Sequence, residues 1–102
     1  MDIKVMKFGG TSLKNEKTRA YVYRHIVKNL ISHKVVVVVS AMGRYPDTYA
    51  TDTLLSLGSP RLSKEEKARL VSMGEQLSAL KVCSELLDTC LCTFFFSSRH
   101  FY

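Results

Sequence analysis

The chain has 102 residues, of which 46% are hydrophobic and 24% are charged, which is enough for one small globular domain and no more. No apolar run approaches the roughly 18 residues of a membrane-spanning helix, and the N-terminus lacks a signal-peptide pattern, so we expect a cytoplasmic protein without a membrane partner. The formal net charge of +6 is carried mainly by the N-terminal third without a basic run, which favours a solvated helix face and a small-anion site over a nucleic-acid surface.

The first expected element is a buried strand over residues 3–8, which runs directly into two adjacent glycines. Gly9 and Gly10 tolerate positive φ and let the backbone approach a bulky group closely. With Lys7 before them and hydroxyl side chains after them, they have the chemistry of a phosphate cradle. The spacing excludes the P-loop and the dinucleotide-binding fingerprint. An ordinary strand-to-helix turn with an exposed lysine shows the same spacing, so the residues alone leave both interpretations open.

A helix is expected over residues 14–32, because apolar residues recur there at three- and four-residue steps. The basic side chains of this helix fall mostly on the opposite, solvent side: Lys17, Arg19, Arg24 and Lys28. The five consecutive valines at 35–39 then predict a strand that is covered on both faces, as in a parallel sheet. In such a β-α-β unit the carboxyl ends of the strands share one edge, so the glycine turn and the loop over 40–43 should converge on one crevice.

Two further helices are expected in the second half. A short helix should begin at Thr51, with Thr51 or Asp52 as its N-cap. The longest helix should begin after Ser63, because Ser63 and Glu66 have the spacing of a capping box. Gly74 interrupts its middle at a cost of about 1 kcal/mol relative to Ala, so we expect it to serve close packing or ligand access.

The end of the chain does not match what precedes it. Residues 90–102 include three adjacent phenylalanines and show neither a helical nor an alternating period. We interpret residues 1–89 as the folded segment and residues 90–102 as an aberrant tail, typical of a frameshift or a premature stop. Cys83, Cys90 and Cys92 do not have the spacing of a zinc site, so we expect free thiols and no metal centre.

Four motifs, taken in order, resemble the start of an aspartate kinase. They are KFGGTS at 7–12, VVVSAMG at 37–43, TDTLL at 51–55 and MGEQ at 73–76. The resemblance runs from about Ile3 to about Asp88. The loop before Thr51 is similar to that of the diaminopimelate-sensitive aspartokinases of Gram-positive bacteria. A glutamate or uridylate kinase of the same superfamily is a competing interpretation. The combination of Thr51-Asp52 with Met73-Gly74-Glu75 argues against it.

The resemblance implies part of an amino acid kinase fold, a three-layer αβα sandwich around a mostly parallel sheet. It implies transfer of the ATP γ-phosphoryl group to the β-carboxylate of L-aspartate, in the biosynthesis of lysine, threonine and methionine. Mg²⁺ is expected with the nucleotide, although no protein ligand for it can be identified. Full-length relatives are expected to be oligomeric.

The resemblance also assigns the ATP-binding residues. Lys7 would neutralise charge on the transferred phosphoryl group and is the expected catalytic residue. Phe8, Gly9 and Gly10 would form the phosphate-binding turn, with backbone N–H groups directed at the phosphates. Ser40, at the end of the second strand, would lie at the nucleotide site.

The resemblance also assigns two substrate-binding residues. Thr51 would hydrogen-bond the aspartate substrate, and Glu75 would bind the α-amino group of that substrate. The later half of the family's catalytic domain supplies an aspartate, an arginine and most of the adenine pocket, and none of these can be matched here. We therefore hypothesise a truncated reading frame that is inactive by itself. A non-catalytic nucleotide- or anion-binding fragment that associates with a full-length aspartokinase subunit is the alternative.

Overall fold

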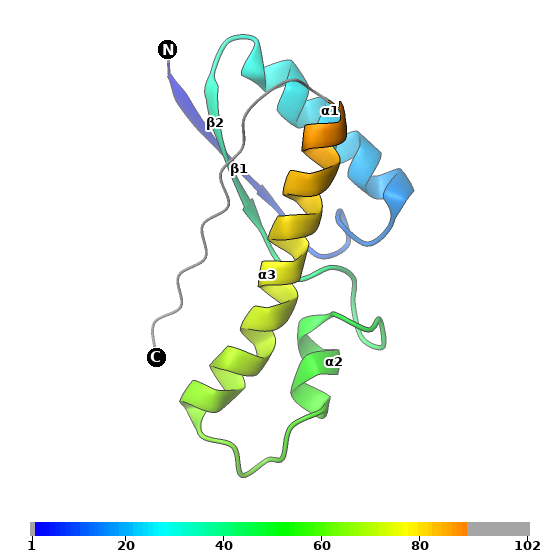
Figure 1. Cartoon of the computed structure of the whole chain (residues 1–102), viewed down its shortest axis with the longest axis vertical. Helices are drawn as coiled ribbons and strands as arrows, with labels where there is room; N and C mark the ends of the chain where they lie inside the picture. The colour runs from blue at the N-terminus through cyan, green and yellow to red at the C-terminus, as the bar shows by residue number, and fades with distance from the viewer. Residues whose placement is uncertain (1, 90–102) are drawn as a thin grey trace.

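The computed structural model describes residues 2–89, which form two parallel strands and three helices (Figure 1). The order is β1 (Ile3–Phe8), α1 (Glu16–Leu30), β2 (Lys34–Val39), α2 (Thr51–Ser56) and α3 (Lys64–Thr89). β1 and β2 pair in parallel from Ile3↔Lys34 to Phe8↔Val39, with α1 as the connection between them. The expected α/β class and the β-α-β unit are confirmed. The proposed tail, 90–102, lies outside the described residues.

One face of the sheet packs against both long helices. The buried core consists of Leu13, Val22, Tyr23, Ile26, Val82 and Leu86. Alternate residues of both strands pack against it, among them Phe8, Val37 and Val39. Because core residues from α1 and α3 form one cluster against which these strand residues pack, the two helices cover the same face (Figure 1). This is one helical layer and the sheet layer of an αβα sandwich.

The other face of the sheet is open. Ile3 and Val5 of β1 are 66% and 65% exposed, and Val36 and Val38 of β2 are 48% and 42% exposed. The expectation that the valine strand is covered on both faces is therefore wrong for the described part of the chain. A continuous apolar run is typical of a strand between two helical layers, but residues 2–89 place both long helices on one side.

Two capping boxes fix the starts of the long helices. Before α1, the Thr18 N–H donates to Asn15 Oδ1 at 2.9 Å and the Asn15 N–H donates to Thr18 Oγ1 at 3.2 Å. Before α3, the Glu66 N–H donates to Ser63 Oγ at 3.1 Å and the Ser63 N–H donates to Glu66 Oε1 at 3.2 Å. The second box was predicted and is confirmed. The first uses an Asn and a Thr in place of the usual Ser/Thr and Glu pair.

The predicted N-cap of α2 is wrong. Ala50 occupies the cap position, with extended backbone and no side-chain hydrogen bond, and Thr51 is already helical. The helix starts there because the Ala50 N–H donates to the Asp47 carbonyl at 3.2 Å and its own carbonyl accepts from Leu54 at 2.9 Å. Backbone bonds within the loop thus replace a side-chain cap.

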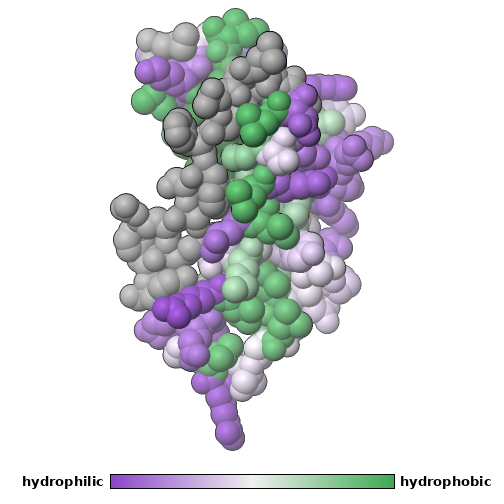
Figure 2. All heavy atoms as spheres, viewed as in Figure 1, coloured by the Kyte–Doolittle hydropathy of each residue, from purple (hydrophilic) through white to green (hydrophobic). Residues whose placement is uncertain are grey.

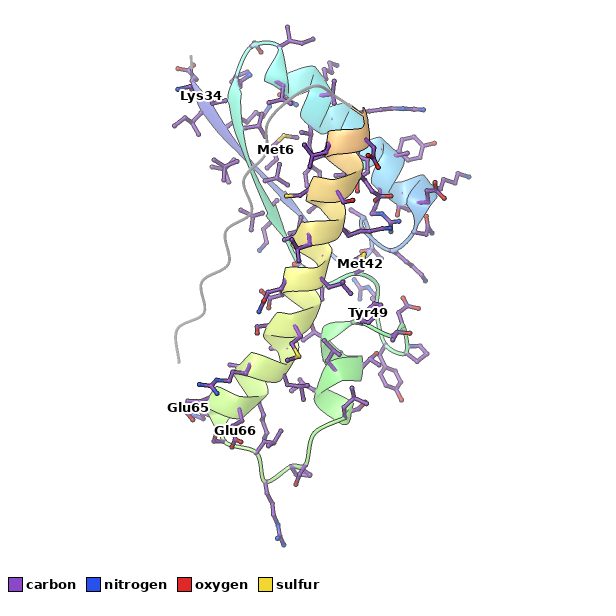
Figure 3. The ribbon with its side chains drawn as sticks, viewed as in Figure 1. Met6, Lys34, Met42, Tyr49, Glu65 and Glu66 are labelled. Carbon is purple, nitrogen blue, oxygen red and sulfur yellow. The ribbon has the colours of Figure 1, made fainter. Side chains whose placement is uncertain are left out.

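Gly74 lets α2 and the loops pack closely on the middle of α3. A Cβ at this position would lie 2.5 Å from the Tyr49 carbonyl oxygen, 2.9 Å from Leu54 Cδ1 and 3.1 Å from Ala41 Cβ. Figure 3 shows Tyr49 next to the N-terminal end of α2. The close-packing prediction for this glycine is confirmed.

The outward side of α3 is also partly apolar. Figure 2 shows apolar side chains along this helix on the face turned to the viewer. Exposed apolar residues of α3 are Met73, Leu77, Leu80 and Leu87. No helix within residues 2–89 combines the length and the hydropathy needed to cross a membrane.

Candidate functional site

The loops that follow the two strands are joined by hydrogen bonds. The Gly43 N–H donates to the Gly10 carbonyl at 2.8 Å, and the Ser40 N–H donates to the Phe8 carbonyl at 3.2 Å. The Gly10 carbonyl also accepts from the Leu13 N–H at 3.3 Å, which closes the turn after β1. The predicted convergence of the two loops at the carboxyl edge of the sheet is confirmed.

Glycine is required where these loops meet. A Cβ on Gly10 would lie 2.5 Å from the Gly43 carbonyl oxygen and 2.8 Å from the Ala41 carbonyl oxygen. Gly43 has a φ of +79°, a conformation that side-chain-bearing residues rarely adopt. Gly9 differs, because a Cβ there would meet nothing within 4 Å. The backbone at Gly9 is therefore open to the approach of a ligand.

A cleft of about 410 Å³ lies beside the joined loops and the start of α2. Its lining consists of Gly10, Thr11, Ser40, Ala41, Gly43, Arg44, Tyr45, Ala50, Thr51 and Asp52. Three of the predicted site residues, Gly10, Ser40 and Thr51, are thus brought together from distant parts of the chain. Lys7, Phe8, Gly9 and Glu75 do not line it.

The remaining predicted residues lie outside this lining, in different environments. Lys7 is exposed and pairs in register with Val38. The Phe8 side chain packs against the core, which leaves only its backbone for a ligand. Glu75 is exposed on α3, beside the tightly packed Gly74.

The sequence did not identify three residues that line the cleft or hold the loop beside it. Arg44 and Asp52 line it, and Asp47 fixes the loop between them. The Arg44 N–H donates to Asp47 Oδ2 at 3.0 Å, the Asp47 N–H donates to the Arg44 carbonyl at 2.7 Å, and Lys14 Nζ lies 3.9 Å from the same carboxylate. Asp side chains often bond to nearby backbone N–H groups in turns, so the Asp after Pro46 is a signal for such a loop.

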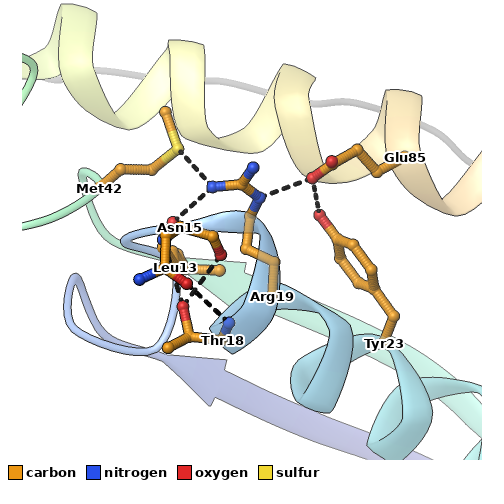
Figure 4. Close-up of polar contacts among 7 residues, drawn as sticks. All are labelled: Leu13, Asn15, Thr18, Arg19, Tyr23, Met42 and Glu85. Carbon is orange, nitrogen blue, oxygen red and sulfur yellow. Dashed lines mark hydrogen bonds and ion pairs between the residues drawn. The ribbon is translucent and has the colours of Figure 1, made fainter.

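A buried polar network lies behind both loops (Figure 4). Arg19 is 8% exposed, in contrast to its expected place on the solvent side of the helix. Its Nε donates to Glu85 Oε1 at 2.6 Å, and its Nη1 donates to the Leu13 carbonyl at 3.0 Å and to Met42 Sδ at 3.9 Å. The Tyr23 hydroxyl donates to the same Glu85 oxygen at 2.6 Å. No local pattern identifies this network, since its partners come from α1, α3 and two loops.

The network holds its members in defined protonation states. Burial, followed by the hydrogen bond to Glu85, raises the pKa of Tyr23 well above its usual range. Burial alone would also raise the pKa of Glu85, but hydrogen bonds from Tyr23 and Arg19 outweigh it and hold that pKa below its usual range. The carboxylate is therefore ionised at neutral pH, and the phenol remains a donor.

The described residues offer little to a metal ion. No group of three or more His, Cys, Asp or Glu side chains within residues 2–89 is placed to hold one. Cys83 is a free thiol. Asp52 is the carboxylate that the cleft lining contains.

Three comparisons with known proteins agree with one another. Residues 2–101 match the family model described as the amino acid kinase family. Aspartokinase 1 of Bacillus subtilis is 50% identical over 93 residues, which cover 86% of this chain and 23% of that protein. Aspartokinase 2 of the same organism is 43% identical over 82 residues, which cover 76% of this chain and 19% of that protein.

The structural comparison gives the same result. The crystal structure of aspartate kinase from Synechocystis superposes on this fold with a TM-score of 0.74 and 34% sequence identity, over 87% of this chain and 15% of that one. The chain therefore spans less than a quarter of the length of the curated relatives that it matches.

Proposed function

The chain belongs to the amino acid kinase family, and from that premise we propose that it supplies the nucleotide end of an aspartate kinase active site. The observation that carries this proposal is the clamped pair of loops at the carboxyl edge of the sheet. The Gly43–Gly10 hydrogen bond holds them together beside a cleft of about 410 Å³. Ligands of parallel sheets bind at this edge.

The proposed reaction is transfer of the γ-phosphoryl group of ATP to the β-carboxylate of L-aspartate. Such transfer depends mainly on positioning and on stabilising negative charge. Gly9 and Gly10 would present backbone N–H groups to the phosphates, and Ser40 would contact the nucleotide from the second loop. Lys7 is exposed near the end of β1, so its flexible side chain can turn toward the phosphates. We expect Mg²⁺ to be held chiefly by ATP, because residues 2–89 group no metal-binding side chains.

L-Aspartate would bind at the other end of the cleft. Thr51 lines the cleft at the first residue of α2, where its hydroxyl could bond to the substrate. Glu75 follows Gly74, which packs against the Tyr49 carbonyl, so the glutamate backbone lies close to the segment that leads into α2. Its carboxylate would select the α-amino group by charge.

The cellular role follows from the same proposal. We place the protein in the cytoplasm, in the route to lysine, threonine and methionine, with diaminopimelate sensitivity suggested by the loop before Thr51. L-Aspartate and ATP are the proposed partners, and we propose no nucleic-acid or membrane role.

A second candidate function rests on the open sheet face. With Ile3 and Val5 about two-thirds exposed, this surface is suited to association with further protein. The chain would then be a non-catalytic nucleotide- or anion-binding fragment that associates with a full-length aspartokinase subunit. Co-purification with an intact aspartokinase, without aspartate-dependent ATP turnover by the chain itself, distinguishes this role.

A chimera tests the proposed reaction. Residues 1–89 replace the corresponding segment of Bacillus subtilis aspartokinase 1, and aspartate-dependent ATP turnover is measured. We expect an active chimera in which Lys7→Met lowers kcat by roughly 10²–10³, the range for loss of a transition-state charge contact. Glu75→Gln should raise the KM for aspartate.

Glu65→Gln is the matched control, because Glu65 lies on the same helix as Glu75, in its first turn (Figure 3). This variant should match the parent chimera. A folded chimera without turnover, or a Lys7→Met variant with unchanged kcat, would contradict the proposed reaction.

A further inference from the structure

Arg19 lies behind both loops of the candidate site and touches each of them. Its Nη1 donates to the Leu13 carbonyl at 3.0 Å, at the end of the first loop, and to Met42 Sδ at 3.9 Å, in the second. Its Nε is paired with Glu85 Oε1 at 2.6 Å. Figure 4 shows the guanidinium between Met42, the Leu13 backbone and Glu85.

The contacts of Arg19 with Leu13 and with Met42 both lie next to the residues that join the two loops, Gly10 and Gly43. The Leu13 N–H donates to the Gly10 carbonyl, so the carbonyl that Arg19 holds belongs to the Gly10 turn. Met42 stands between Ala41 and Gly43, the two residues whose carbonyl oxygens would lie within 3 Å of a Cβ on Gly10. Arg19 itself does not line the cleft.

Burial makes this arrangement specific to arginine. A buried cation is costly unless each of its donors is satisfied, and the Arg19 side chain is only 10% exposed. The planar guanidinium carries donors that point in fixed, divergent directions, whereas a lysine ammonium is a compact point charge. A lysine could keep the charge pair with Glu85, but it could not also reach both loops in the same geometry.

We propose that Arg19 is a positioning residue, which holds the 9–13 and 40–43 loops in the arrangement that binds phosphate and anchors them to α3 through Glu85. The phosphate-binding part of this inference rests on the proposed function. The anchoring part rests on the described contacts alone.

Tyr23 provides a control within the same network. Its hydroxyl donates to Glu85 Oε1 at 2.6 Å, and its side chain is as buried as that of Arg19. Among the described residues its hydroxyl bonds to neither loop. Tyr23→Phe therefore removes a buried hydrogen bond from the network and leaves the bond from Arg19 to Leu13 in place.

Amide hydrogen exchange of the full 102-residue chain tests the anchoring. The reporters are the N–H groups of Leu13 and Gly43, both of which donate to the Gly10 carbonyl. In Arg19→Lys we expect both to exchange about tenfold faster, while the amides of the β1–β2 ladder change by less than about threefold. In Tyr23→Phe the two reporters should keep their wild-type rates relative to the ladder.

Several outcomes would overturn the anchoring. These are unprotected reporters in the wild-type chain, unchanged reporters in Arg19→Lys, an equal rise at every amide, and loss of the fold in Arg19→Lys. The last two would make Arg19 a general stabilising residue.

Added ATP then separates the two parts of the inference. We expect ATP to shift the amides of the cleft, with about tenfold weaker apparent affinity in Arg19→Lys and unchanged affinity in Tyr23→Phe. If the reporters depend on Arg19 but ATP shifts no cleft amide, the proposed function is wrong and the anchoring stands. If ATP binds equally well to Arg19→Lys, the positioning role is wrong and the proposed function stands.

Discussion

The two faces of the β1–β2 sheet differ, although the run of five valines in β2 contributes side chains to both. Val37 packs against the core, whereas its neighbour Val38 is 42% exposed. Strand geometry directs successive side chains to opposite faces, so one run of identical residues enters two environments. Residues 2–89 thus pack both long helices on one side of the sheet, which we call the covered face, and leave the apolar side chains of the other, the open face, exposed.

The loops of the candidate site are anchored from the covered face. Arg19 of α1 bonds to the Leu13 carbonyl and to Met42 Sδ, and Glu85 of α3 pairs with Arg19. On the open face the described chain provides no comparable support. Stability and site geometry should therefore respond to changes on the covered face and be nearly indifferent to changes on the open side.

The largest expected effect is Leu86→Ala. Leu86 is 1% exposed in the core, and removal of such a side chain costs about 2–5 kcal/mol of unfolding free energy. Leu87→Ala is the matched control on the adjacent residue, which is 55% exposed and should cost less than about 1 kcal/mol. Urea denaturation of both variants measures the difference, and equal losses would remove the distinction between the two sides of α3.

Gly10→Ala should separate the two loops. The added Cβ would lie 2.5 Å from the Gly43 carbonyl oxygen, and we expect a loss of about 1–3 kcal/mol from the forced backbone shift. Gly9→Ala controls for the loss of glycine itself, because its Cβ would meet nothing within 4 Å. Thermal denaturation should show a clear loss for the first variant and little change for the second; the reverse order would contradict the clamped geometry.

Glu85→Gln should lower the free energy of unfolding by about 1–2 kcal/mol at neutral pH, since it removes the charge of a partly buried pair.

This effect should depend on pH. The pKa of Glu85 is lower in the folded chain than its ordinary 4.5, so its ionisation stabilises the fold above that pH. This contribution is lost as pH falls through the folded-state value. The stability gap between wild type and Glu85→Gln should therefore shrink below about pH 4.5. A gap that is constant from pH 7 to pH 3 would show that the charge contributes nothing.

The smallest effect on stability is expected on the open face. Val36→Thr combined with Val38→Thr should change the free energy of unfolding by less than about 0.5 kcal/mol per site. It should lower aggregation, because it interrupts an exposed apolar strand. The matched pair Val35→Thr and Val37→Thr points toward the core and should be clearly destabilising. Sedimentation at increasing concentration, together with urea denaturation, measures both; an equal loss from the two pairs would mean that the faces do not differ.

Local patterns predicted much of the fold. The Ile3–Phe8 strand, the Ser63–Glu66 capping box and the packing role of Gly74 depend on neighbours in sequence or on glycine geometry, and all are observed. The meeting of the two loops followed from parallel topology. Two of the predictions that failed did so for different reasons: the N-cap of α2 because backbone bonds within the loop replace a side-chain cap, and the solvent-side placement of Arg19 because it depends on a distant partner. Arg19 is buried by Glu85, 66 residues away, and no helical period shows such a contact.

The candidate site divides in the same way. Gly10, Ser40 and Thr51 line one cleft, as expected from loops that meet at a sheet edge. Lys7 and Glu75 lie outside its lining, and their roles stay predictions. Their side chains are exposed, so their positions depend on what binds rather than on the packing of residues 2–89.

Titration of the 102-residue chain with ATP, followed by amide chemical shifts, tests most directly whether the clamped loops bind nucleotide phosphates. We predict saturable shifts at Gly10, Thr11, Ser40 and Gly43, their suppression by inorganic pyrophosphate, and their loss in Gly10→Ala. Amides of the open face, such as those of Val5 and Val36, should not move. Shifts confined to the open face, or no saturable shift at the four loop amides, would contradict the account.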